Sequence, residues 1–563
     1  MIEKELDRLI REAVVQAGPE LGITAPPVEI EVLRPRQREH GDYSTNVALA
    51  LAKQSGRGAR EVAEIVARNL PESEHVSKHE IAGPGFINFF VTHGWLHRIL
   101  EEIRSASEGY GRLLVESSEH VQVEFVSTNP TGPLHIGHAR NAVVGDALCR
   151  VLETAGHRVS REYYVNDSGT QARLFGASIE ARYLEHYGRP GEIPEGGYGG
   201  DYVKEIASEL AGEHGEALLE MPEDDRRALL AREGMRIALD GIKESLERFG
   251  VRFDEWFHES TMHAQGKVDE AVRLLLERDL AYEKDGAVWF RATQYGDEKD
   301  RVLVRANGEP TYFAADCAYL GEKFARGFDR LIYVWGADHH GTVKRLRGAA
   351  EALGHDPARV EFILTQLVAL YRDGVPARMS KRTGDIVTLD ELLDEVGPDA
   401  ARYTLLSRSV DTSLDFDIEL VKRQTLDNPV YYVQYAHARI ASLLRYAAEQ
   451  GTPMVPFSDV TPEELAHETE LELLRVLGEL PEQIRLAAEL RAPYRLTKYA
   501  EEVAAEFHRF YTECRVVTED EALTQARLHL AAATRQVLAN VLAILGVSAP
   551  ESMDRLAEEE EGG

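Results

Sequence analysis

The sequence predicts a multidomain α/β protein in which a Rossmann-like, doubly wound central domain lies between a small α+β domain and an all-α helical bundle. Three observations predict this class. The 563 residues exceed one ordinary domain. Short apolar strands alternate with helical patterns between residues 113 and 400. From residue 401 onward almost the whole chain has helical periodicity, which is typical of a bundle.

The first predicted domain covers residues 1–112. It begins with an amphipathic, charge-rich helix that has no signal-peptide character. A strand-like VEIEVLRP (28–35) and a long helical pattern over 44–70 follow, and the β-rich GPGFINFFV (83–91) closes the domain.

The second predicted domain covers residues 113–400. Its strands include VQVEFV (121–126), HRVSREYYVND (157–167) and DRLIYVWGADHH (329–340). The turn-rich HYGRPGEIPEGGYGGDYV (186–203) interrupts the alternation, so we expect an inserted segment over about 175–300. The helical bundle then spans 401–553, and residues 554–563 form an acidic tail that is too polar to pack.

Composition limits the classes of function. Hydrophobic residues make up 44% and charged residues 28%, as in ordinary globular proteins, and no run approaches a membrane span, so we expect a cytoplasmic protein without a membrane partner. The net charge of −32 usually argues against a polyanionic partner, but an acidic chain can still carry a basic face. Three widely spaced cysteines without a CxxC pair predict neither disulfides nor a structural metal.

The segment TGPLHIGHAR (131–140) lies where a strand turns into a helix. There the helix N-terminus offers unpaired N–H groups to an anion, and His135 and His138 lie on the same face of the first turn. Gly137 removes a side chain where a ligand approaches closely. A pair of ordinary surface or core histidines is the plainer interpretation. Metal binding is a weaker alternative, because no third ligand lies nearby.

A second motif, ARMSKRTGDIVTL (377–389), is a short basic loop centred on Met379, Ser380, Lys381 and Arg382. Together the two motifs resemble the signatures of class I aminoacyl-tRNA synthetases, in which the lysine neutralises the pyrophosphate that leaves ATP. Longer segments resemble arginyl-tRNA synthetases, and the resemblance covers nearly the whole chain: EFVSTNPTGPLHIGHARNAVVGD (124–146), EPTYFAADCAYL (309–320), YVWGADHHG (333–341) and NPVYYVQYAHARI (428–440).

The resemblance implies an enzyme that activates L-arginine with ATP and Mg²⁺ and transfers it to tRNA(Arg) in translation, and we expect a monomer. It implies catalytic roles for His135, His138 and Lys381, and Gly132 stands where some family members carry a substitute lysine. It places ATP at Gly137, Met379, Ser380 and Arg382. It places arginine, whose guanidinium prefers carboxylates in fork geometry, at Glu124, Asn129, Tyr312, Asp316, Asp338 and His339.

The resemblance also implies two tRNA-binding regions. The first domain would contact the tRNA elbow, with Gln37, His40 and Asp42 as candidates, and the bundle would bind the anticodon. Residues 483–515 interleave basic residues, among them Arg495 and Lys498, with the aromatic residues Tyr494, Tyr499, Phe507 and Phe510. These rings suit either stacking on unpaired bases or the bundle core.

Two other classes of protein remain as alternatives. A small nucleotidyltransferase of the pantothenate-synthetase kind shares both ATP motifs but lacks a long helical C-terminal region, which this chain has. A non-catalytic paralogue that only binds RNA would be expected to have lost one of the residues His135, His138 or Lys381, and all three are present.

Overall fold

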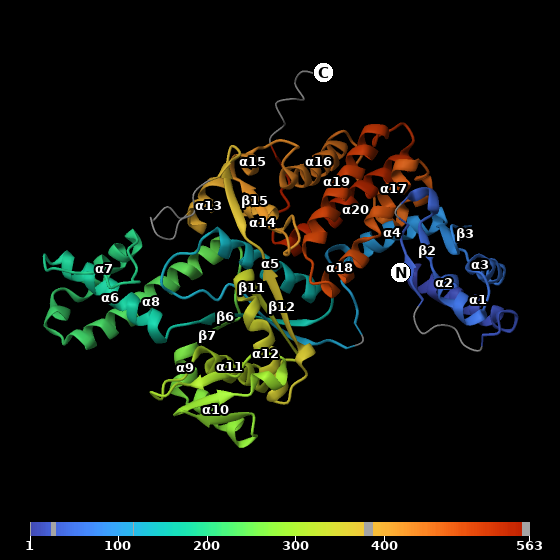
Figure 1. Ribbon diagram of the computed structural model, residues 1–563. Coiled ribbons are helices and arrows are strands. Elements are labelled where there is room, and N and C mark those ends of the chain that lie inside the picture. Colours follow the sequence, from blue (N-terminus) through green and yellow to red (C-terminus); the bar gives the residue numbers. More distant parts are fainter. Residues whose placement is uncertain (1, 24–29, 36, 116, 377–386, 554–563) are drawn as a thin grey trace. The chain divides into compact units, whose positions relative to one another are not determined.

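The computed structural model describes residues 2–23, 30–35, 37–115, 117–376 and 387–553 (Figure 1). The chain divides into two compact units. The first comprises Met1–Ser107, Leu443–Glu479 and Glu506–Gln536, and the second comprises Glu108–Ser442, Leu480–Ala505 and Val537–Gly563.

The N-terminal part of the first unit is a small α+β assembly. Its antiparallel sheet has the strand order β1-β2-β4-β3, formed by β1 (Val32–Leu33), β2 (Tyr43–Thr45), β3 (Val76–Ala82) and β4 (Phe86–Val91). Four helices accompany the sheet: α1 (Ile2–Leu21), α2 (Val47–Ser55), α3 (Ala59–Arg68) and α4 (His93–Ala106). The amphipathic pattern of the first residues does form a helix, which buries Leu6, Ile10 and Val14.

The long helical pattern over residues 44–70 forms two helices. They are α2 and α3, which are separate because Gly56 ends α2 in the left-handed conformation with φ 67°. Glycine adopts this conformation without the steric cost that a Cβ imposes, so it commonly terminates a helix.

The second unit contains the parallel sheet that the sequence predicts. Its strand order is β12-β11-β5-β6-β7, and every neighbouring pair is parallel. Helix α5 (Ile136–Thr154) connects β5 to β6, and α12 (His340–Ala352) connects β11 to β12. The order reverses between β5 and β11, and such a switch point is where doubly wound folds bind ligands at the carboxyl ends of the strands. The five strands are β5 (His120–Glu124), β6 (Arg158–Val165), β7 (Glu255–His258), β11 (Arg330–Gly336) and β12 (Val360–Thr365).

Two inserted segments interrupt this sheet, where the sequence predicted one. Between β6 and β7 lie the helices α6 (Gly169–His186), α7 (Asp201–His214) and α8 (Glu223–Arg248), coloured teal to green in Figure 1. Between β7 and α11 (Tyr312–Ala325) lie α9 (Glu259–Ala264), α10 (Lys267–Glu277) and an antiparallel sheet of β8 (Ala281–Lys284), β9 (Ala287–Phe290) and β10 (Arg301–Val304). Strand β7 therefore belongs to the central sheet although it lies inside the single insertion expected over 175–300.

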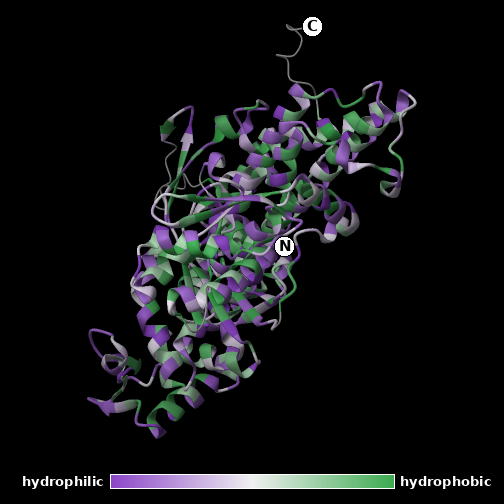
Figure 2. Cartoon of the chain, turned by 90° about the vertical axis from the view of Figure 1, so that its right-hand side faces the viewer, coloured by the Kyte–Doolittle hydropathy of each residue, from purple (hydrophilic) through white to green (hydrophobic). Residues whose placement is uncertain are grey.

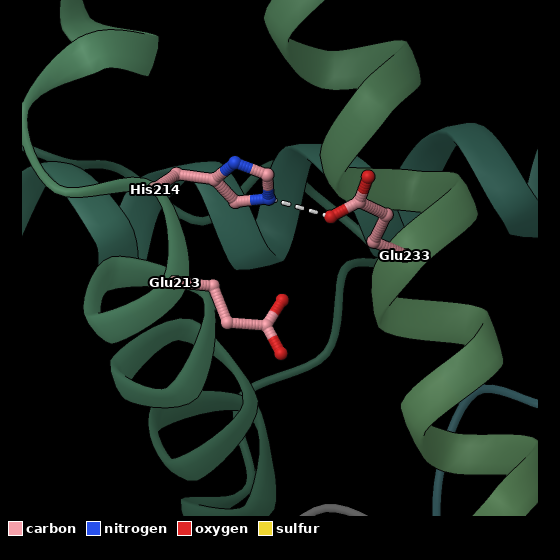
Figure 3. A group of neighbouring side chains, drawn as sticks. All are labelled: Glu213, His214 and Glu233. Atoms are coloured by element: carbon pink, nitrogen blue, oxygen red, sulfur yellow. Dashed lines mark hydrogen bonds and ion pairs between the residues drawn. The ribbon is translucent and has the colours of Figure 1, made fainter.

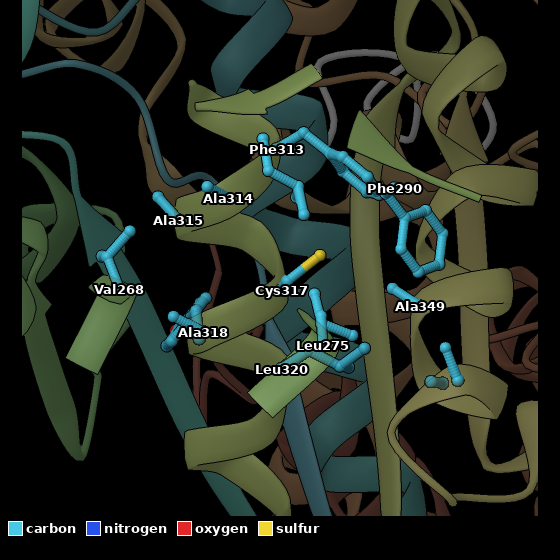
Figure 4. Close-up of a cluster of buried hydrophobic side chains, with 14 of the residues drawn as sticks. Val268, Leu275, Phe290, Phe313, Ala314, Ala315, Cys317, Ala318, Leu320 and Ala349 are labelled. Carbon is cyan, nitrogen blue, oxygen red and sulfur yellow. The ribbon is translucent and has the colours of Figure 1, made fainter. Parts of the chain in front are cut away.

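Helix α11 is anchored by its apolar side. Phe313, Cys317 and Leu320 pack with Leu275 and Phe290 in one buried cluster (Figure 4). This packing fixes the rotation of α11 and thereby decides which way its polar residues face. Cys149, Cys317 and Cys514 are buried free thiols.

Helices dominate the C-terminal region, and Figure 2 shows hydrophobic and hydrophilic residues alternating along them. A strand that the sequence did not predict, β15 (Leu414–Asp417), pairs in parallel with β13 (Val368–Arg372), which also pairs with β14 (Val375–Pro376). The helices are α13 (Leu389–Val396), α14 (Pro398–Leu406), α15 (Ile418–Lys422), α16 (Pro429–Glu449), α17 (Glu468–Leu477), α18 (Leu480–Glu489), α19 (Tyr494–Glu513) and α20 (Glu521–Leu545).

Helix α20 corrects the expectation that no run approaches a membrane span. Its 25 residues are long and apolar enough for a span by length and composition. However, 78% of its most apolar window is buried within the protein, as in the core helix of a folded domain.

Candidate functional site

A strained turn follows β5 at the switch point. Val126 and Ser127 have left-handed φ values of 66° and 42°, which are costly for residues other than glycine. Hydrogen bonds hold this conformation: the N–H of Val126 donates to Oδ1 of Asn141 at 2.5 Å, and the N–H of Tyr164 donates to Oγ of Ser127 at 3.1 Å. The turn thus leads from Glu124 to the start of α5 along a fixed path.

His135 and His138 cap α5. Their rings stack with centroids 3.6 Å apart, the N–H of Gly137 donates to Nδ1 of His135 at 3.1 Å, and the N–H of His135 donates to Nδ1 of His138 at 3.3 Å. Because both Nδ1 atoms accept hydrogen bonds, each neutral ring carries its proton on Nε2. The pair therefore presents two N–H donors beside a helix N-terminus, which suits an anionic ligand.

Gly137 has a structural reason to be glycine, besides its predicted place in the ATP site. A Cβ at this position would lie 3.0 Å from Cε1 and 3.2 Å from Nδ1 of His135. The glycine therefore makes room for the capping ring of His135, and its contact with ATP stays a prediction.

The basic motif of Met379, Ser380, Lys381 and Arg382 lies outside the described residues. We call residues 131–140, which contain His135 and His138, the histidine turn. The described residues that follow the basic motif lie beside this turn: Thr388 forms an antiparallel bridge with His135, and the N–H of Leu389 donates to the carbonyl of Leu134 at 2.8 Å. The buried guanidinium of Arg140 also donates to the carbonyl of Gln366, just before β13, at 2.9 Å.

Four carboxylates gather on the face of the sheet that α11 covers. Glu124 of β5 is in register with Glu162 of β6 and with Tyr333 of β11. Glu259, the first residue of α9, and Asp316 of α11 complete the cluster, which we call the acidic cluster. The sequence indicated Glu124 and Asp316 but not Glu162 or Glu259.

Three members of the acidic cluster have strong internal partners. Lys323 lies 2.5 Å from Glu124, and Arg326 lies 2.6 Å from Glu162. Glu259 accepts hydrogen bonds from the hydroxyls of Tyr164 at 2.7 Å and Ser168 at 2.6 Å. Cations therefore pair with Glu124 and Glu162, whereas neutral hydroxyl groups bind Glu259.

Asp316 is the exception. Among the described residues, no hydrogen bond or ion pair reaches its half-buried carboxylate. Burial, followed by the charges of Glu124 and Glu259, raises the pKa of Asp316 to about 7, although Arg345 and Lys323 oppose the shift. A carboxylate with no direct hydrogen bond or ion pair to a described residue favours a cationic ligand in this setting.

The other predicted ligand residues lie on three different segments of the second unit. Tyr312 begins α11 one turn before Asp316, is 52% exposed, and places its hydroxyl 3.7 Å from where a Cβ of Gly169 would lie. Asn129 is half-buried in the turn after β5. Asp338 and His339, with side chains 84% and 58% exposed, follow β11 in a short 3₁₀ helix and lie 3.8 Å from each other.

A cleft of about 650 Å³ adjoins this region and was not foreseen from the sequence. Pro130, Ser168 and Gly169 form its end near Asn129 and Tyr312, and α6 and α8 form its walls. Its cations outnumber its carboxylates, Asp167 and Asp240, although the whole chain is acidic. The lining cations are Arg173, Arg232, Arg236 and Lys243.

One group in the described residues has the composition of a metal site. Glu213, His214 and Glu233 lie within reach of one another on α7 and α8, and Nε2 of His214 lies 2.6 Å from Glu233 (Figure 3). Glu213 is exposed, and the contact between His214 and Glu233 accounts for the pair without an ion.

The residues proposed for RNA contact fall into two groups. Gln37, His40 and Lys498 are exposed, whereas Asp42 is bound within the first unit by Arg475 at 2.6 Å and by the N–H of Val91 at 2.8 Å. Arg495 is half-buried, with Nη2 3.4 Å from Gln483. The stacking interpretation was wrong for three rings, because Tyr499, Phe507 and Phe510 are at most 2% exposed and belong to the core.

Family models match most of the chain. They are the arginyl tRNA synthetase N terminal domain over residues 4–91, the class I (R) tRNA synthetase catalytic domain over 103–417 and the DALR anticodon binding domain over 433–553. An arginine–tRNA ligase of Carboxydothermus hydrogenoformans is 49% identical over 98% of this chain and 99% of its own length. The chain belongs to the arginyl-tRNA synthetase family.

Further relatives agree with this assignment to the arginyl-tRNA synthetases. The arginine–tRNA ligase of Geobacter sp. (strain M21) is 49% identical over 93% of this chain and 95% of its own length. The solved structure of Thermus thermophilus arginyl-tRNA synthetase superposes with a TM-score of 0.76 at 25% identity, covering 97% of this chain and all of that one. The multidomain α/β fold predicted from the sequence is thereby confirmed.

Proposed function

We infer that the protein is an arginine–tRNA ligase, which activates L-arginine with ATP to arginyl-adenylate and transfers the arginyl group to tRNA(Arg) in translation. The observation that carries this conclusion is the unpaired carboxylate of Asp316, in an acidic cluster beside the histidine turn at the switch point of the sheet. The family membership supports the same reaction.

Activation needs no nucleophilic side chain. The carboxylate of arginine attacks the α-phosphorus of ATP, a P–O bond forms, and pyrophosphate leaves, so catalysis consists of positioning and charge stabilisation. The Nε2–H groups of His135 and His138 would donate to phosphate oxygens. Lys381, with Ser380 and Arg382, would bind the β- and γ-phosphates, and Met379 would lie against the nucleotide. Mg²⁺ would enter as the ATP complex, held mostly by phosphate oxygens.

The arginine pocket would lie between α11 and the strand ends. Asp316 and Glu124 would receive the guanidinium, and the charge of Glu259 also acts on Asp316. Tyr312 and Asn129 would lie at the border of this pocket. Asp338 and His339 stay predicted contacts of arginine. They follow β11, which lies across the switch point from β5. A pocket that hydrogen-bonds a guanidinium leaves buried groups unpaired when another amino acid enters, so binding alone can discriminate strongly.

The pKa of Asp316 predicts how arginine binding depends on pH. Arginine needs the ionised carboxylate, and a carboxyl group with a pKa of about 7 is mostly protonated at pH 6 and mostly ionised at pH 8. The KM for arginine should therefore be about tenfold higher at pH 6 than at pH 8. Steady-state exchange kinetics between these values would measure the change, and a KM for arginine that does not vary with pH would contradict it.

The basic cleft between α6 and α8 is a suitable path for the 3′ strand of tRNA, because cations predominate in its lining and its end meets the predicted arginine site. Arg173 has no carboxylate partner among the described residues; its Nη2 bonds Oγ1 of Thr170 at 3.1 Å. Arg173→Glu should weaken tRNA binding about tenfold at fixed salt. Arg189→Glu, beyond the other end of α6, is the matched control, and equal losses in both variants would refute the path.

The remaining assignments extend the same function. Residues 1–112 would contact the tRNA elbow, with Gln37 and His40 as exposed candidates, and 401–553 would bind the anticodon, in keeping with the family model over 433–553. Asp42 has a structural role in its ion pair with Arg475, which explains the residue without RNA contact. The enzyme would act as a monomer in the cytoplasm.

A further inference from the structure

Tyr202, the second residue of α7, joins the inserted helices to the histidine turn. Its hydroxyl donates to the carbonyl of Thr131, the first residue of that turn, at 2.9 Å. Thr131 is buried, and a buried carbonyl that loses its hydrogen-bond partner is costly to the protein. The contact therefore fixes the place at which the chain enters the turn that leads to His135.

Two glycines accommodate the side chain of Tyr202. A Cβ at Gly132 would lie 3.1 Å from both Cζ and the hydroxyl oxygen of Tyr202, and a Cβ at Gly200 would lie 2.5 Å from Cε1. Gly200 has φ −66°, and Gly132 is also outside the left-handed region, so neither position needs glycine for its backbone conformation. Space for the tyrosine side chain explains both glycines.

The turn-rich segment 186–203 brings Tyr202 to this position. The N–H of Tyr198 donates to Oγ of Ser178 on α6 at 2.9 Å, and the hydroxyl of Tyr198 bonds Oε1 of Gln171 on the same helix. Tyr202 also packs against the apolar cluster that α6, α7 and α8 bury between them. The segment, which the sequence shows only as an interruption of the α/β alternation, thus holds one tyrosine in a fixed place.

A second contact supports the other end of the same stretch of the turn. The N–H of Leu389 donates to the carbonyl of Leu134 at 2.8 Å, while Tyr202 donates to the carbonyl of Thr131. Distant parts of the chain therefore hold both ends of residues 131–134, directly before the two stacked histidine rings. A displacement of a catalytic group by about 1 Å can lower a rate about 100-fold, so the position of this stretch matters for the reaction.

We propose that Tyr202 is a positioning residue for arginine activation, whose hydroxyl holds the histidine turn so that His135 and His138 meet the phosphates of ATP. The proposal rests on the proposed function, since it concerns the same reaction. Tyr202 acts through the backbone of the turn and not on the substrates. Because hydrogen bonds to the phosphates strengthen as charge develops in the transition state, the effect should appear in kcat and not in KM.

The test begins with Tyr202→Phe in pyrophosphate exchange with tRNA present. The variant keeps the ring and loses only the hydrogen bond to Thr131. We expect kcat to fall about tenfold, with the KM values for ATP and arginine changed less than about threefold. Tyr187→Phe is the matched control, because the Tyr187 hydroxyl donates to the carbonyl of Ala211 at 3.1 Å and its ring packs against the same apolar cluster. Its kcat should stay within about twofold of the wild-type value.

A double-mutant cycle tests whether Tyr202 acts through the histidines. His138→Asn keeps an acceptor for the N–H of His135 but lacks the Nε2 donor. In this background Tyr202→Phe should lower kcat by at most about threefold, because one of the donors that it positions is already absent. A substitution that merely reduced the amount of folded protein would lower kcat by the same factor in both backgrounds.

Three results would overturn the proposal. They are an unchanged kcat in Tyr202→Phe, an equal fall of kcat in Tyr187→Phe, and a fall of about tenfold when Tyr202→Phe is added to His138→Asn. Failure of the wild-type protein to activate arginine would instead refute the proposed function.

Discussion

Replacing Asp316 by asparagine is expected to raise the KM for arginine about 10- to 150-fold, with the KM for ATP changed less than about threefold. The asparagine would keep the size of the side chain but lose the charge-assisted hydrogen bond, which is worth about 1.5–3 kcal/mol. Only the binding of arginine should weaken, because no described residue bonds Asp316. The histidine turn, which would bind ATP, is held by other contacts. Exchange kinetics with each substrate varied in turn would measure both constants.

Asp201→Asn is the control for this substitution, since the Asp201 carboxylate at the start of α7 is 87% exposed and pairs with Lys204 at 2.8 Å. It should change the KM for arginine far less than Asp316→Asn does. The Asp316 variant should also lose the rise in KM below pH 7. If its two KM values rise together, Asp316 does not belong to the arginine pocket.

Arg402→Met is expected to destabilise the second unit by about 3–5 kcal/mol. Arg402 and Asp146 are each 1% exposed and form a buried ion pair, and the guanidinium also donates to the carbonyls of Phe249 at 2.9 Å and Leu545 at 3.2 Å. Methionine fills a similar volume but leaves these acceptors unsatisfied. Urea unfolding followed by tryptophan fluorescence would measure the change.

Arg248→Met is the matched control for stability. Arg248 bonds Asp390 and Asp394 at 2.5 Å each, but its side chain is 48% exposed. Exposed ion pairs contribute at most about 1 kcal/mol, so this variant should unfold close to the wild-type midpoint. If both variants lost a similar free energy of unfolding, burial would not explain how much the Arg402 ion pair stabilises the protein.

Much of the site could be predicted because its signals are local. The histidine turn is read from residues 131–140, where a strand becomes a helix, and the structure adds only the tautomer that the capping bonds impose. The steric role of Gly137 could not be predicted, because the sequence does not show that a Cβ there would meet the ring of His135.

The pairing inside the acidic cluster could not be predicted because it depends on distant segments. Lys323 and Glu124 are 199 residues apart and meet only through the packing of α11 on the sheet. Glu259 follows a strand of four residues, which is too short for a clear periodic signal. In residues 483–515, the spacing of the rings could have indicated the core: Tyr499, Phe507 and Phe510 recur at helical intervals and face inward.

The central claim is that Asp316 and its surroundings select arginine for activation. The most direct test is ATP–pyrophosphate exchange by the wild-type protein with each of the twenty amino acids in turn, in the presence of unfractionated tRNA. We expect exchange with arginine at least about 10⁴-fold more efficient than with any other amino acid. Exchange supported by a different amino acid, or by none, would contradict the account.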